Sequence, residues 1–88
     1  SAASDVYKRQ GLMRFRTADG VVIEGATFED IANVLWQQVM VPEPSLHDWM
    51  EENAKRAEMW DGTKLPVSSV EDHIRAMIAA GHLVELSD

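Results

Sequence analysis

The sequence predicts an α+β fold in which an N-terminal β-hairpin, with room for a short third strand, packs against three α-helices. The hairpin is indicated by an Asp-Gly turn signal between two short segments of residues 13–25. The helices are indicated by three segments with apolar residues at spacings of three and four, each preceded by a Ser or Thr that can cap a helix. With no linker or repeat between these segments, residues 13–88 are expected to form a single small domain.

The hairpin is predicted to have a three-residue loop whose glycine is left-handed, although an Asp-Gly pair usually favours two residues. A two-residue loop would set apolar residues opposite charged ones. The three-residue loop sets Phe15 opposite Ile23 and Arg14 opposite Glu24. One face then becomes apolar, the other carries a cross-strand ion pair, and helices are expected to cover the apolar face.

The first helix is predicted from Thr27 to about Val39. Thr27 can serve as the N-cap, with Asp30 three residues later, and the helix has to end before Pro42. The expected core stripe consists of Phe28, Ile31, Ala32, Leu35 and Val39.

The central helix is predicted to lie between Ser45, as N-cap, and Gly62, as the left-handed residue that ends it. Asp48 suits the positive end of the helix dipole, and Glu51 with Lys55 forms an expected i,i+4 pair. The expected core stripe is Leu46, Trp49, Met50, Asn53, Ala57 and Trp60. The expected solvent side is His47, Asp48, Glu51, Glu52, Lys55 and Glu58.

The third helix is predicted to follow Ser68 or Ser69, of which Ser68 has Glu71 at capping-box spacing, and to end at a left-handed Gly81. Its expected buried face is Val70, Ile74, Met77 and Ile78.

Two further segments are short and extended. Residues 63–67 contain Pro66, which would confine a strand there to a sheet edge. Residues 83–86 can add a short strand after the third helix, with Leu83 folding back on its last turn.

Residues 1–12 are expected to be a non-native leader. The segment SAASDVYKRQ resembles the in-frame translation of a sequencing-library transposon adapter, which implies that the gene came from assembled metagenomic reads. Residues 13–88 keep six of the eight Lys and Arg and 14 of the 15 Asp and Glu, so the net charge changes from −7 to −8.

Composition narrows the function classes. An acidic surface opposes direct binding to nucleic acid or to anionic membranes, and is compatible with simple solubility or with a basic partner. Cysteine is absent, which excludes disulfides and thiolate zinc sites, and no apolar run approaches the ~20 residues of a membrane helix. A cytoplasmic location is expected.

Motifs for chemistry are weak, and the chain is not expected to be an enzyme or to bind a cofactor. There is no nucleophile elbow, phosphate-binding loop or zinc-protease motif. His47 and Glu51 could share a metal, but two ligands do not make a site, and His82 after Gly81 is better explained as a helix-end contact. The AAGHLVEL ending is similar to a winged-helix recognition helix, yet Arg75 is its single cation, so no direct nucleic-acid contact is expected.

From Met13 onward the chain resembles a family of short, uncharacterised bacterial and phage or mobile-element proteins of unknown function. The resemblance rests on MRFRTADG with VVIEG, on SLHDWMEENAKRA with WDG, and on VEDHIRAMIAAGHL. It implies an architecture and a genomic context but transfers no catalytic residue. The stiff connector at residues 42–44 departs from the pattern and could shift how the central helix docks.

The first functional hypothesis is a small acidic protein–protein interaction module that binds or inhibits a host protein, in one version by charge mimicry of nucleic acid. The second is a homo-oligomeric structural or adaptor subunit using an exposed patch of Trp36, Met40 and Val41, where Trp36 could instead belong to the core. The third is a small metal-binding protein or enzyme. The expected interaction surface consists of Trp36, Met40, Val41, Asp48, Glu51, Glu52 and Glu58.

Overall fold

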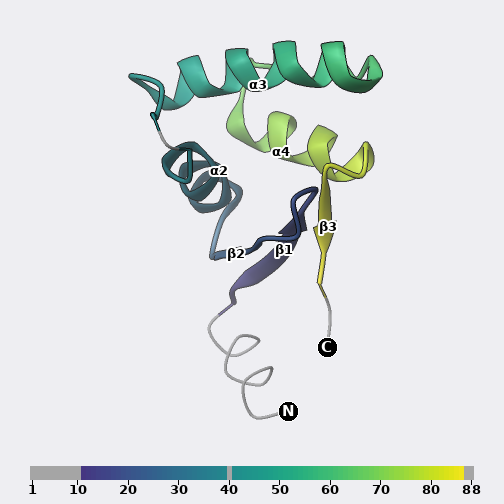
Figure 1. Cartoon of the computed structure of the whole chain (residues 1–88). Coiled ribbons are helices and arrows are strands. Elements are labelled where there is room, and N and C mark those ends of the chain that lie inside the picture. The colour runs from purple at the N-terminus through teal and green to yellow at the C-terminus, as the bar shows by residue number, and fades with distance from the viewer. Residues whose placement is uncertain (1–10, 40, 87–88) are drawn as a thin grey trace.

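The computed structural model describes residues 11–39 and 41–86, and there it has a three-stranded antiparallel sheet and three helices (Figure 1). The predicted α+β fold is therefore confirmed, whereas residues 1–10 of the expected leader lie outside the described residues. The elements are β1 (Met13–Thr17), β2 (Val22–Gly25), α2 (Phe28–Gln37), α3 (Leu46–Asp61), α4 (Val70–Ala79) and β3 (Leu83–Glu85).

The hairpin of β1 and β2 has the predicted three-residue loop. The backbone N–H of Thr17 donates to the carbonyl of Val21 at 2.9 Å, and Gly20 is left-handed with φ +86°. Phe15 pairs with Ile23, and both side chains are buried. Only this register puts both apolar side chains on the face that the helices cover.

The sheet order is β2-β1-β3, so the third strand joins the free edge of β1. Leu83 of β3 pairs with Thr17 and is buried. On β1 and β2, Arg14 faces Glu24, and their side-chain nitrogen and oxygen lie 3.8 Å apart. Residues 63–67 form no strand, but they do deliver buried Leu65 to the core.

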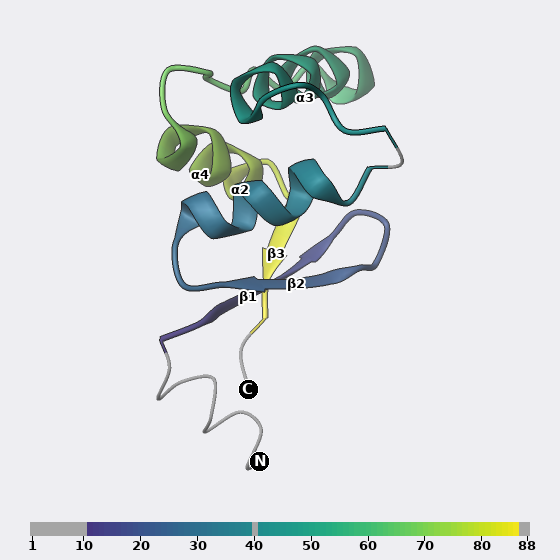
Figure 2. The same ribbon diagram turned by 90° about the vertical axis from the view of Figure 1, so that its left-hand side faces the viewer.

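The molecule has three layers, which Figure 2 shows from the side. The sheet is one outer layer, α2 and α4 lie across it, and α3 lies on these two helices as the other outer layer (Figures 1 and 2). The core fills the space between the layers and consists of Phe15, Ile23, Ile31, Ala32, Leu35, Trp49, Met50, Ala57, Leu65, Ile74, Met77 and Leu83.

Each helix begins at a hydroxyl cap, because the first backbone N–H groups of a helix have no partner within it. Thr27, Ser45 and Ser69 accept from the backbone N–H three residues later, each at 3.1 Å. The cap of α4 is thus Ser69, and the capping box expected from Ser68 is wrong.

The ends of α3 and α4 also follow the prediction. Gly62 and Gly81 are left-handed. After α4, the N–H of His82 donates to the carbonyl of Met77 at 2.9 Å, and the N–H of Gly81 donates to Ile78 at 3.1 Å, which is a Schellman ending.

Two helix predictions need correction. Helix α2 ends at Gln37, and Val39 is exposed. The chain leaves the helix early and enters the connector, whose prolines have no backbone N–H to continue the helical hydrogen bonds. On α4, His73 is fully buried although the expected face did not include it, whereas Val70 and Ile78 of that face are half-buried and pack against the core. None of the helices in the described part has the length and apolar character that crossing a membrane requires.

Candidate interaction surface

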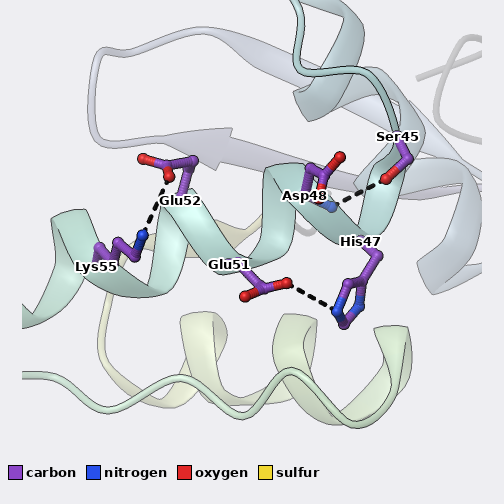
Figure 3. Close-up of polar contacts among 6 residues, drawn as sticks. All are labelled: Ser45, His47, Asp48, Glu51, Glu52 and Lys55. Carbon is purple, nitrogen blue, oxygen red and sulfur yellow. Dashed lines mark hydrogen bonds and ion pairs between the residues drawn. The ribbon is translucent and has the colours of Figure 1, made fainter.

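The acidic residues of α3 do not form one stripe. The carboxylate of Glu51 lies 2.9 Å from Nε2 of His47, and that of Glu52 lies 3.3 Å from Nζ of Lys55. Figure 3 shows Glu51 and Glu52 pointing to different sides of the helix. The predicted pairing of Glu51 with Lys55 is therefore wrong, since Glu51 pairs with His47 and Lys55 pairs with Glu52. Exposed pairs of this kind contribute about 0–1 kcal/mol to stability.

Asp48 and Glu58 occupy the two ends of α3. Asp48 is half-buried in the first turn, where its backbone N–H donates to the Ser45 hydroxyl and its carboxylate suits the helix dipole. Glu58 is exposed, and its backbone carbonyl accepts from the N–H of Gly62 at 3.0 Å. Asp48 thus has a structural explanation, whereas the Glu58 carboxylate is presented to solvent.

Trp36 lies at the edge of the core and holds the connector that follows α2. Its ring is half-buried against the core, and its Nε1–H donates to the carbonyl of Glu43 at 2.7 Å. Val41 is 82% exposed, and Met40 lies outside the described residues. Of the expected patch, Trp36 therefore belongs with the core, and Val41 is the member that the structure shows at the surface.

The largest exposed apolar side chains lie at the other end of α3. Met59 is 88% exposed and Trp60 is 66% exposed, so the prediction that Trp60 belongs to the core is wrong. At 1.5 Å per residue, the 16 residues of α3 span about 24 Å, whereas the ten residues of α2 or α4 span about 15 Å. Helix α3 is thus the longest of the three described helices, and its last turn carries both of these exposed side chains.

Trp60 is nevertheless held in place by a polar contact below its ring. The ring of His82 lies 5.0 Å from that of Trp60, and Nε2 of His82 donates to the Asp61 carboxylate at 2.8 Å. Hydrogen bonds from Thr63 and from His82 lower the pKa of Asp61 to about 2, so its carboxylate is ionised at neutral pH. One face of the indole is thereby supported while much of the side chain remains in solvent.

A groove of about 740 Å³ opens beside Trp60, between the hairpin loop, the end of α2 and the second half of α3. Clefts of about 300–1,000 Å³ are the usual size for binding sites. Core residues such as Trp49, Ala57 and Met77 contribute apolar atoms to its lining. Its two formally charged residues are Asp19 on the hairpin and Arg56 on α3. The groove is thus partly apolar and carries opposite charges on two of its walls.

A second histidine lies inside the molecule between α3 and α4. Nδ1–H of His73 donates to the carbonyl of Pro66 at 2.8 Å, which leaves Nε2 to accept from the Asn53 amide at 3.0 Å. The ring meets Trp49 edge-on at 5.4 Å between centroids. Burial lowers the pKa of His73, so the neutral form is favoured in the fold. This network connects elements of the core.

The sequence carried a signal for His73 that the prediction did not use. Val70, His73, Ile74, Met77 and Ile78 follow the spacing of one helix face, and His73 lies in the middle of it. For the groove no such signal exists, because its walls come from segments far apart in the chain.

A metal site finds no support in the part of the chain that the structure describes. No three His, Asp or Glu side chains gather there in a way that could hold an ion. His47 and Glu51 form the exposed contact already described.

No protein-family model, curated protein or solved structure matches the chain. Function therefore has to be inferred from the surface itself.

Proposed function

We propose that this chain is a small acidic protein–protein interaction module that binds a basic partner protein through the exposed side chains of α3. The observation that carries the proposal is the exposure of Met59 and Trp60 on a helix whose other exposed side chains include the carboxylates of Glu51 and Glu58. Trp and Met are enriched in protein interfaces, and a large aromatic side chain in solvent is a typical anchor.

The charge of the chain favours a basic partner. The net charge is −7, and an acidic surface attracts a positively charged protein over distances of about the screening length. The proposal includes a phage or mobile-element origin, a cytoplasmic location and a host protein as partner. Inhibition of a nucleic-acid-binding host protein by charge mimicry is one form of it. No catalytic step, cofactor or direct nucleic-acid contact belongs to the proposal.

The test is a capture experiment with the full chain, tagged at its C-terminus, in a bacterial lysate at low and high salt. The expected result is a stoichiometric basic partner that high salt releases. Glu51→Lys with Glu58→Lys should abolish capture, and Trp60→Ser should weaken it. Glu85→Lys, which changes half as much charge as the double variant, and Val22→Ser are controls, because they change an exposed acid and an exposed valine on the sheet.

The outcomes separate clearly. Loss of the partner in the α3 variants, with retention in both controls, would support the proposal. Equal capture by all variants would place the contact elsewhere, and a partner that resists high salt would contradict its electrostatic basis.

A further inference from the structure

The groove beside Trp60 differs in charge from the rest of the chain. The whole chain carries a net charge of −7, so two copies repel each other over most orientations. The groove-lining residues instead include one formal negative charge, on Asp19, and one formal positive charge, on Arg56. Two copies that met at this face would bring together surfaces whose formal charges balance.

The same face carries both an apolar projection and a recess. Trp60 lines the groove with two thirds of its surface exposed, next to the still more exposed Met59. A two-fold axis makes an interface self-complementary, since each contact occurs twice with the copies exchanged. An exposed side chain next to a groove suits such an interface, because each copy can insert its side chain into the groove of the other.

We propose that two copies of this chain associate about a two-fold axis across the groove. Trp60 of each copy enters the groove of the other, and Arg56 of each copy faces Asp19 of the other. The walls are suited to this exchange because they carry opposite charges and come from different elements, the hairpin loop and α3.

The support beneath Trp60 favours this association. His82 packs against the indole, and Asp61 fixes His82, so the ring loses little freedom when it is covered. An aromatic side chain buries about 150–250 Å². Two Trp60 side chains and their grooves therefore give an interface at the lower end of the range for specific contacts, and the dimer is expected to be weak, with a Kd between about 1 μM and 1 mM.

The dimer goes beyond the proposed function, and salt separates the two. A basic partner bound to the acids of α3 is released by salt. Salt strengthens the self-association of an acidic chain. The screening length falls from about 10 Å at 0.1 M to about 3 Å at 1 M, and this reduces the repulsion between copies. Failure of one idea thus leaves a distinguishable result for the other.

The first experiment is light scattering on the full chain over a concentration series at low and high salt. A mass that rises towards the dimer with concentration, and rises further with salt, is expected. Trp60→Ser should weaken the dimer about tenfold or more, while Val22→Ser, a change at an exposed valine on the sheet, should leave it unchanged. A monomer at about 1 mM in high salt would overturn the proposal, as would dimerisation that Trp60→Ser does not affect.

The second experiment uses charge reversal and excludes a folding artefact. Asp19→Arg alone sets two positive charges against each other across the axis, and Arg56→Asp alone sets two negative charges there. Each variant should therefore be a weaker dimer than the wild type.

An equimolar mixture of the two variants should regain association. In a mixed dimer the two substituted side chains face each other with opposite charges, and the native Arg56 of one copy faces the native Asp19 of the other. A mixture that associates no better than the separate variants would contradict the proposed geometry.

Discussion

Two tryptophans of α3 each contact a histidine from another segment of the chain, and the two pairs have different surroundings. Trp49 is 3% exposed and meets His73 inside the core, whereas Trp60 is 66% exposed and covers His82, which is itself only 8% exposed. The residues are 11 apart, which is about three helical turns, so both rings are on the same face of the helix. The difference shows that position along a helix, as well as face, decides whether an aromatic residue stabilises the fold or is available for binding.

The histidines are both buried but differ in their hydrogen-bond partners. His73 is bonded to a backbone carbonyl and an amide, with no acid among these partners, so it is neutral in the core. His82 is bonded to the carboxylate of Asp61, which remains partly in solvent. The first pair is thus suited to holding elements together, and the second to fixing a ring at the surface.

The largest expected effect is on stability at the two tryptophans. Trp49→Ala should lower the free energy of unfolding by about 3–5 kcal/mol, because it leaves a cavity in the core. Trp60→Ala should change it by less than about 0.5 kcal/mol, as substitutions at exposed positions usually do. Urea denaturation followed by circular dichroism measures both. Similar losses for the two variants would remove the distinction between the pairs.

The next effect concerns the histidine side chains. His73→Ala should cost about 1–3 kcal/mol, because it leaves the Pro66 carbonyl and the Asn53 amide without their buried partner. His82→Ala should cost less, since its partner Asp61 can turn to water. Thermal unfolding of the two variants at neutral pH compares them, and a larger loss for His82→Ala would reverse the assignment.

The pH dependence of stability should also separate them. Burial lowers the pKa of His73 in the fold below its ordinary value of 6.5, so the unfolded chain binds the proton more tightly. Stability is then fully present above pH about 6.5 and falls as the pH decreases towards the lowered folded pKa. Chemical denaturation between neutral and mildly acidic pH should show this fall. His73→Phe should remove part of it, and an unchanged slope in that variant would contradict the role given to His73.

The smallest effect is expected at Asp61. Its pKa in the fold is lowered from 3.8 to about 2, so its stabilising bonds are present above pH 3.8 and are lost as the pH falls towards 2. Asp61→Asn should leave stability at pH 7 nearly unchanged but should loosen the ring of Trp60. Fluorescence anisotropy of Trp60 in a variant with Trp36 and Trp49 replaced by Phe would detect the change. Anisotropy equal to that of the Asp61-containing parent would show that Asp61 does not fix the ring.

Local chemistry made much of the fold predictable. The loop of the hairpin follows from the pairing of Phe15 with Ile23, and the helix ends follow from Ser45, Gly62 and Gly81. Each of these depends on residues within a few positions of one another, and a cap or a register has one solution that satisfies the backbone and buries the apolar side chains.

The interaction surface was less predictable for the same reason. Trp36 donates to Glu43 across the connector, and Lys55 pairs with Glu52 instead of Glu51, two neighbours between which the energy differs little. The groove brings Asp19 near α3, although 37 positions separate Asp19 from Arg56 in the sequence. No local pattern records that proximity.

The sequence by itself determined the α+β class, the register of the hairpin and the caps of the helices, because hydrogen-bond satisfaction and periodic burial act over a few residues. The tertiary structure alone decided that the last turn of α3 leaves Met59 and Trp60 exposed. Burial depends on which atoms of other elements are present, and periodicity along one helix contains no information about what packs against each of its turns. Trp49 and Trp60 have the same place in the pattern, and the atoms that surround each ring make one of them core and the other surface.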